Sequence, residues 1–316
     1  MTHALPPVTT LAVPADKVNT LAVPASNVYT LAAPASNVYT LAAPARWQRI
    51  DFISDLHLHE TEPANFLAWR RYLETTPADA VFILGDLFEV WVGDDILRHQ
   101  TNSSATPSNA ATRHQGTHFE DRCARVLHHA AQHKALYFMH GNRDFLLGSA
   151  ALQACGMQLL PDPTVLEFAG QRYLLSHGDA LCLGDTDYQA FRAMVRTDKW
   201  QQDFLHHPLQ ERLQMARKLR AQSEARKLQG GPWVDVAPDA TEQWMNAAGA
   251  QHMIHGHTHE GVDHPITSAQ GPGVRHVLSD WHADAQPPRA QVLRLDRTET
   301  THSRLQRLSL DAVTAQ

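Results

Sequence analysis

Short apolar runs, each followed at once by polar residues, recur along the chain from Trp47 onward. The runs are rich in Val, Ile, Phe and Tyr, and segments long enough for helices separate them. This pattern predicts buried strands of an α/β fold. The predicted strands are 49–54, 80–84, 135–139, 173–176 and 252–254, with a helix over 119–133.

Each predicted strand ends at a polar motif. In chain order the motifs are Asp55-Leu56-His57, Gly85-Asp86, Gly141-Asn142-Arg143-Asp144, His177-Gly178-Asp179 and Gly256-His257-Thr258-His259. Because ligands of α/β folds gather at the carboxyl ends of strands, we expect these motifs to meet. An Asp and a His two residues apart point to the same side of a strand end, and a carboxylate can bridge two cations. Oxygen and nitrogen ligands without thiolate favour Mn²⁺, Fe²⁺ or Zn²⁺.

Each motif taken alone has an ordinary structural explanation. His57 or His177 alone is better explained by a hydrogen-bonded core or surface histidine, and Asp86 alone can be a helix N-cap. The chain has 21 histidines, so a chance His-x-His is expected. Only the ordered set of motifs favours a two-metal site.

The N-terminal segment 1–46 contains a repeat with a period of ten residues, which begins at Thr10. Thr20–Tyr29 and Thr30–Tyr39 are two of its copies. Each copy contains a proline and few large apolar groups, so it cannot bury enough surface to offset chain entropy. We expect a disordered extension, with a docking peptide as the alternative. The Ser-, Thr- and Asn-rich segment 100–116 predicts a mobile loop.

Composition limits the partners. A chain of 316 residues, 43% of them hydrophobic, can bury one sizeable core. The net charge of −6 argues against broad nucleic-acid binding. No apolar run approaches the roughly 20 residues that span a bilayer, and a secretory signal pattern is lacking, so a cytoplasmic protein is expected. The three cysteines lack zinc-type spacing and are expected to be reduced structural thiols.

The order of the motifs resembles that of the calcineurin-like metallophosphoesterases. More narrowly, four segments are similar to the UDP-2,3-diacylglucosamine hydrolase family of lipid A biosynthesis: Gly85–Asp95, Gly141–Gly148, His177–Arg192 and Ile254–His259. The resemblance implies a four-layer α/β/β/α sandwich with an inserted helical lid. The implied domains are a catalytic domain over 47–297, the lid over 188–230 within it, and a C-terminal tail over 298–316.

The resemblance also implies a reaction and a site. The family reaction is water attack on the α-phosphorus of the UDP group, with two Mn²⁺ per chain. The implied metal ligands are Asp55, His57, Asp86 and His259 for the first ion, and Asp86, Asn142, His177 and His257 for the second. The implied catalytic residues are Asn142, Arg143, His177 and His257. The implied substrate contacts are Asn142, Arg143, Asp185, Tyr188, Ser223, Lys227 and His257.

Arg143 stands where many phosphatases and phosphodiesterases of the superfamily carry a histidine. Arginine cannot act as a general acid near neutral pH, but its planar fork can clamp a phosphate with two hydrogen bonds. Arg143 therefore favours a diphosphate substrate. Two positions depart from the family: Glu260 follows His259 where arginine is usual, and Lys227 lies at a shifted spacing from Ser223. Four further acids are expected to bond loops rather than hold metal: Asp94, Asp95, Asp144 and Asp179.

The lid is the expected contact with lipid. Residues 191–228 carry nine Lys or Arg against four acids, among apolar side chains that either line an acyl groove or pack on the core. We expect peripheral contact with the cytoplasmic face of the inner membrane, a monomer, and no nucleic-acid partner. The competing functions are hydrolysis of another nucleotide, phosphodiester or phosphoprotein, and a non-catalytic scaffold of the same fold.

Overall fold

The computed structural model describes residues 38–97, 118–228 and 234–314, and these belong to one compact unit. The predicted mobile loop at 100–116 and most of the repeat segment lie outside the described residues. The backbone of Ser223 and Lys227 is helical, but their side chains are not among those described.

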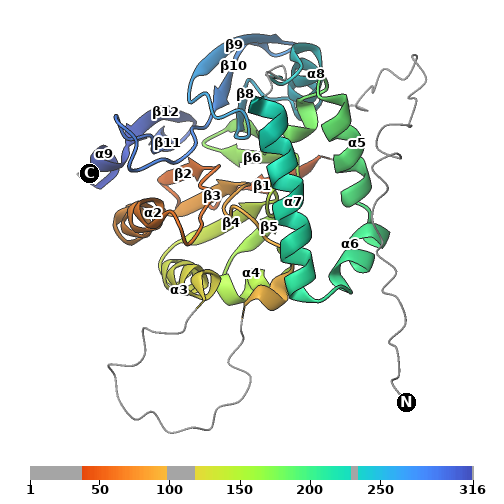
Figure 1. Cartoon of the computed structure of the whole chain (residues 1–316). Helices are drawn as coiled ribbons and strands as arrows, with labels where there is room; N and C mark the ends of the chain where they lie inside the picture. The colour runs from red at the N-terminus through yellow and green to blue at the C-terminus, as the bar shows by residue number, and fades with distance from the viewer. Residues whose placement is uncertain (1–37, 98–117, 229–233, 315–316) are drawn as a thin grey trace, which may run out of the picture. The chain divides into compact units, whose positions relative to one another are not determined.

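Two sheets of six strands each pack against one another (Figure 1). Their strand orders are β1-β6-β7-β8-β10-β9 and β12-β11-β2-β3-β4-β5. The strands are β1 Tyr39–Ala42, β2 Arg49–Ile53, β3 Ala80–Leu84, β4 Ala135–Met139, β5 Gln158–Leu160, β6 Thr164–Phe168, β7 Gln171–Ser176, β8 His252–His255, β9 Asp263–Ser268, β10 Gly271–Val277, β11 Gln291–Glu299 and β12 His302–Ser309. The five strands predicted from apolar runs are confirmed as β2, β3, β4, β7 and β8.

Parallel pairing brings the motifs together. In one sheet β2, β3 and β4 run parallel, and in the other β7 and β8 run parallel. The carboxyl ends of parallel strands share an edge, so the loops that follow these five strands begin at two neighbouring edges. Fully buried aromatic side chains, among them Phe52, Phe82 and Tyr173, fill the space between the sheets.

Helices cover the outer faces of both sheets, which completes the four layers. On the β2–β3–β4 sheet lie α2 Pro63–Thr75, α3 Phe119–Ala131, α4 Ser149–Cys155 and α9 Leu310–Thr314. On the other sheet α8 Pro238–Ala248 packs against β7 and β9. Helix α2 has a proline in its first turn and buries Phe66, Trp69 and Leu73, at the three- and four-residue spacing of a core-facing stripe. Within the described residues there are also two short 3₁₀ helices, η1 Asp94–Ile96 and η3 Asp179–Leu181.

Three helices follow β7 and η3 in the predicted lid segment: α5 Thr186–Val195, α6 Asp198–Leu205 and α7 Leu209–Leu228 (Figure 1). The Asp185 carboxylate caps α5 by accepting from the backbone N–H of Tyr188. Arg212 of α7, only 2% exposed, donates to the carbonyl of Val92 and pairs with Asp95. A buried arginine thus fixes α7 to the loop after β3.

The apolar lid residues are divided between the core and the surface. Phe204 is buried in the core cluster, and Trp200 packs against that cluster. Met194 and Leu205 are instead 46% and 43% exposed. The same helices therefore contribute to the core and also present apolar surface.

The catalytic unit extends beyond the predicted boundaries of 47 and 297. Strand β1, inside the predicted disordered extension, pairs in parallel with β6, and Leu41 packs against the core between the sheets. Strand β12, inside the predicted tail, pairs along its length with β11. Both are edge strands: β1 takes its hydrogen bonds from β6, far along the chain, and β12 forms a hairpin with β11. Local composition does not reveal such pairing. Among the described helices none is long and apolar enough to cross a membrane.

Candidate metal centre

The loops that hold the candidate ligands adopt strained backbone conformations. The φ angle is 53° at Asp55, 48° at His57, 53° at Asp86, 67° at His257 and 60° at His259. Positive φ is uncommon in residues other than glycine, and each such conformation costs of order 1–3 kcal/mol. Strain concentrated at these polar residues points to a functional constraint on the loops that carry them.

The same loops approach one another very closely. A Cβ atom on Gly141 would lie 2.1 Å from Oδ1 of Asp86, and one on Gly256 would lie 2.4 Å from Oδ2 of Asp55. Since neither contact is sterically possible, only glycine allows these loops to meet. The candidate ligands are therefore brought together by backbone packing as well as by strand order.

Asp55, His57 and His259 form the first group, with candidate ligand atoms all within 4.8 Å of one another. The Asp55 side chain is fully buried, and its Oδ1 lies 3.1 Å from Nε2 of His259. Nδ1 of His57 lies 2.9 Å from Oε2 of Glu89, whereas its buried Nε2 makes no hydrogen bond among the described residues. Leaving buried polar atoms without partners is costly, and a bound cation would supply a partner for His57.

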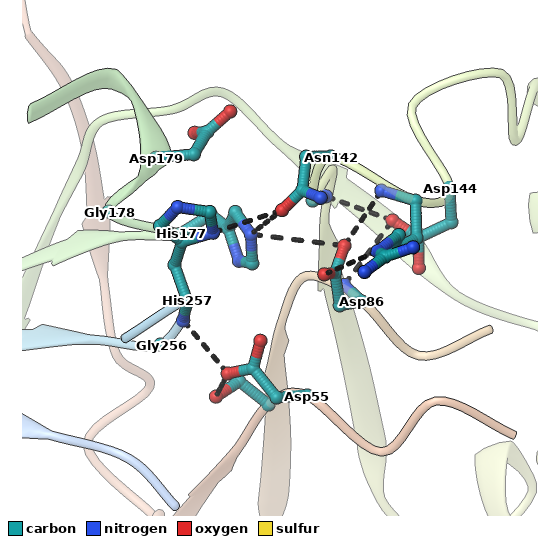
Figure 2. Close-up of polar contacts among 12 residues, drawn as sticks. Asp55, Asp86, Asn142, Asp144, His177, Gly178, Asp179, Gly256 and His257 are labelled. Carbon is teal, nitrogen blue, oxygen red and sulfur yellow. Dashed lines mark hydrogen bonds and ion pairs between the residues drawn. The ribbon is translucent and has the colours of Figure 1, made fainter. Parts of the chain in front are cut away.

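Asp55, Asp86 and His177 form the second group. Nδ1 of the buried His177 lies 2.8 Å from the carbonyl oxygen of Leu84, which can only accept, so Nδ1 carries the proton. Nε2 then faces Oδ1 of Asn142 at 3.0 Å (Figure 2). Because Oδ1 of Asn142 can only accept, either a proton on Nε2 or a cation between the two atoms must complete this contact.

His257 completes this side of the site. Its Nδ1 lies 3.0 Å from the same Asn142 oxygen, and its backbone N–H donates to Oδ2 of Asp55 (Figure 2). Oδ1 of Asp86 lies 3.8 Å from Nε2 of His177. All seven sequence-predicted ligands thus belong to one connected cluster.

The electrostatics of the cluster call for positive charge. Burial alone would lower the pKa of His177, but the carboxylates of Asp86 and Asp179 outweigh it, and the pKa rises to about 9. Burial and the neighbouring His177 lower the pKa of His257 to about 4. One imidazole therefore holds a proton against the buried carboxylates while the next gives its proton up. Divalent cations fit this donor set.

Asp144 binds loops rather than metal, as the sequence predicted. Its buried carboxylate accepts from the backbone N–H of Gly141 at 2.9 Å and of Leu87 at 2.7 Å. It accepts more weakly from the N–H groups of Asp86 and Phe88, both at 3.3 Å. One carboxylate thus joins the loop after β3 to the loop after β4.

Arg143 lies beside the cluster. Its backbone N–H donates to Oδ1 of Asp86 at 2.8 Å, and its Nε lies 4.0 Å from Oδ2 of the same residue. This Nε is buried and has no hydrogen-bond partner among the described residues. Glu260, the departure from the family pattern, pairs with His264 at 3.1 Å.

The predicted substrate contact Tyr188, on α5, lies near His257. The ring of Tyr188 stacks on that of His257 with centroids 6.0 Å apart, and its hydroxyl donates to Oδ2 of Asp179 at 2.5 Å. Asp185 caps the helix and is otherwise exposed. Tyr188 therefore connects the lid to the loop after β7.

Sequence reasoning missed two lid arginines that contact the motif loops. Nε of Arg192 donates to Oδ2 of Asp179, and Nη2 of Arg196 donates to the carbonyl of Gly141, each at 2.8 Å. Arg192 lies on α5 and Arg196 is its C-cap, and their four-residue spacing places both on one face, which was the available signal. Burial opposes the charge of Asp179, but Arg192 and His177 hold the pKa of that carboxyl well below its usual range.

A family model described as calcineurin-like phosphoesterase matches residues 48–261. The chain belongs to this family of metal-dependent hydrolases, and the resemblance seen in its motifs is confirmed. A UDP-2,3-diacylglucosamine hydrolase of Cellvibrio japonicus is 41% identical over 73% of this chain and 90% of its own length. A protein of the same name from Xanthomonas campestris pv. campestris is 41% identical over 78% of this chain and 94% of its own. Another protein of that name, from Chromohalobacter salexigens, is 39% identical over 72% of this chain and 87% of its own length.

Proposed function

We propose that this chain hydrolyses the diphosphate bond of UDP-2,3-diacylglucosamine, giving UMP and 2,3-diacylglucosamine 1-phosphate. The observation that carries the proposal is the buried Nε of Arg143, which makes no hydrogen bond among the described residues and lies beside the buried cluster of carboxylates and imidazoles. With dications bound to the cluster, the Arg143 guanidinium would lie beside positive charge, and a diphosphate between them would supply the anion that both attract. The names of the relatives support the same substrate.

The donor set suits two Mn²⁺ ions per chain. Asp55, His57, Asp86 and His259 would hold the first, and Asp86, Asn142, His177 and His257 the second. When bound, such ions lower the pKa of a water molecule and stabilise displacement at phosphorus.

The side chains of the protein orient the reactants. The bond from Nδ1 of His177 to the Leu84 carbonyl keeps Nε2 free for coordination. The guanidinium fork of Arg143 would hold the diphosphate by charge-assisted hydrogen bonds, without taking part in proton transfer. Four further residues would contact the sugar and its phosphate: Asp185, Tyr188, Ser223 and Lys227.

The lid would receive the acyl chains at the cytoplasmic face of the inner membrane. Met194, Leu205 and Leu219 are exposed on it, and the exposed Lys218 lies on α7. Each well-placed basic residue contributes about 1 kcal/mol to attraction toward anionic lipid. The protein should therefore bind vesicles that contain anionic lipid and leave neutral vesicles unbound. Vesicle binding that is independent of lipid charge would contradict this part of the proposal.

The substrate assay compares UDP-2,3-diacylglucosamine with bis(p-nitrophenyl) phosphate, each with Mn²⁺. Wild-type protein should release UMP from the lipid, and Asp86→Ala should release none, because both ions would lose a ligand. The exposed Asp203→Ala variant serves as the matched control and should keep full activity. Rapid hydrolysis of the small diester with an inert UDP-lipid would favour a different phosphodiesterase.

A further inference from the structure

Glu89 lies between the candidate metal centre and the lid. It follows Asp86 by three residues on the loop after β3, and its side chain is 17% exposed. Its Oε2 lies 2.9 Å from Nδ1 of His57. Its Oε1 pairs with Nη1 of Arg220, on the third lid helix α7. Nη1 of Arg220 also lies 3.4 Å from the backbone carbonyl of Glu89.

The two ring nitrogens of His57 have different neighbours. Nδ1 faces the carboxylate of Glu89, whereas Nε2 lies 4.0 Å from Oδ2 of Asp86, inside the cluster. A carboxylate that binds the nitrogen not used for the metal orients the histidine ring and makes the metal-binding nitrogen more basic. The contacts place Glu89 in that relation to His57.

Glu89 can hold this position because Arg220 balances its charge. Asp55 and Asp86 already bring two buried carboxylates to the site, so a third without a cation would be repelled from it. Arg220 occupies the side of Glu89 that faces α7. The same helix therefore supplies the charge that keeps Glu89 beside His57.

We propose that Glu89 is a positioning residue for His57, and that Arg220 couples the docking of α7 to the geometry of the first metal site. The inference rests on the proposed two-metal function. It assigns a second role to α7, because the helix that meets the lipid also holds one of the ligands in place.

The anchor at Arg212 makes this coupling testable. Arg212 lies eight residues before Arg220, and its bonds to Val92 and Asp95 hold α7 independently. Removing the Arg220 charge should therefore leave the lid docked while it releases Glu89. Arg217, exposed on the same helix, provides a matched control.

The experiment measures Mn²⁺ binding to the full-length protein by calorimetry, in wild type and in Glu89→Ala, Glu89→Gln, Arg220→Met and Arg217→Met. Wild type should bind two ions. Glu89→Ala should weaken one site about 10- to 100-fold, as loss of such a carboxylate does elsewhere, and Arg220→Met should weaken the same site. The isosteric Glu89→Gln, which keeps an acceptor oxygen, should lose less Mn²⁺ affinity than Glu89→Ala. Arg217→Met should bind Mn²⁺ with wild-type affinity at both sites.

Turnover adds a second readout. Glu89→Ala should lower kcat and leave KM for the lipid unchanged, since it alters a ligand and no substrate contact. Wild-type Mn²⁺ affinity in Glu89→Ala, or in Glu89→Gln if the alanine variant does not fold, overturns the role of Glu89. Wild-type affinity in Arg220→Met overturns the coupling to α7. A wild-type protein that binds no Mn²⁺ overturns the proposed function as well, which distinguishes the two failures.

Discussion

Gly141→Ala should disable the metal centre with a single methyl group. The new Cβ would lie 2.1 Å from Oδ1 of Asp86 and 2.4 Å from the Asp86 backbone nitrogen. Non-bonded carbon and oxygen atoms need about 3 Å or more, so the loops after β3 and β4 must separate by roughly 1 Å. Their separation would break the bond from the Arg143 N–H to Asp86 and move Asn142 away from His177. A misplacement of about 1 Å costs on the order of 100-fold in rate.

The assay is kcat/KM for UMP release, together with Mn²⁺ affinity by calorimetry. Both should fall, with kcat/KM lower by about 100-fold or more. Gly249→Ala is the control: its φ of 60° is also unfavourable for alanine, but its nearest neighbour is Arg172, away from the site. It should lose about 1–2 kcal/mol of stability and keep wild-type kcat/KM. Gly141→Ala with normal Mn²⁺ affinity and turnover would refute the close packing of these loops.

Three further outcomes follow from single features. Arg143→Ala should lower kcat/KM by roughly 100-fold, and Arg143→Lys should restore only part of it, because lysine lacks the planar fork; steady-state kinetics decide this. Arg294→Met should lower the free energy of unfolding, measured in urea, by about 3–5 kcal/mol, because the fully buried carboxylate of Asp51 loses its 2.7 Å ion pair. Burial raises the pKa values of Cys155 and Cys182 to about 12, so both remain neutral thiols at pH 8. Native protein should not react with a thiol reagent at these positions, whereas urea-unfolded protein should react at once.

The sequence predicted the strands that carry the site because each one is a continuous apolar run. The run 80–84 matches β3 residue for residue, and 135–139 matches β4. Strand β1 was missed because Leu41 gains its burial from β6, which lies more than a hundred residues away. The polar motifs and their order were visible, since residue types alone identify candidate ligands.

The contacts that arrange the ligands were beyond reach of the sequence. Nothing local marks Glu89 as a neighbour of both His57 and Arg220, because the three residues come from separate parts of the chain. The carbonyl of Leu84 that orients His177 is likewise invisible, since every residue has one. Such contacts depend on which loops meet, and only the packed sheets determine that.

Hydrolysis in ¹⁸O-labelled water tests the central claim most directly. Purified protein, Mn²⁺ and UDP-2,3-diacylglucosamine are incubated, and the products are analysed by mass spectrometry. Attack on the α-phosphorus predicts UMP that carries one ¹⁸O and unlabelled 2,3-diacylglucosamine 1-phosphate, with no product in chelator. Label in the sugar phosphate, or no UMP at all, would contradict the account.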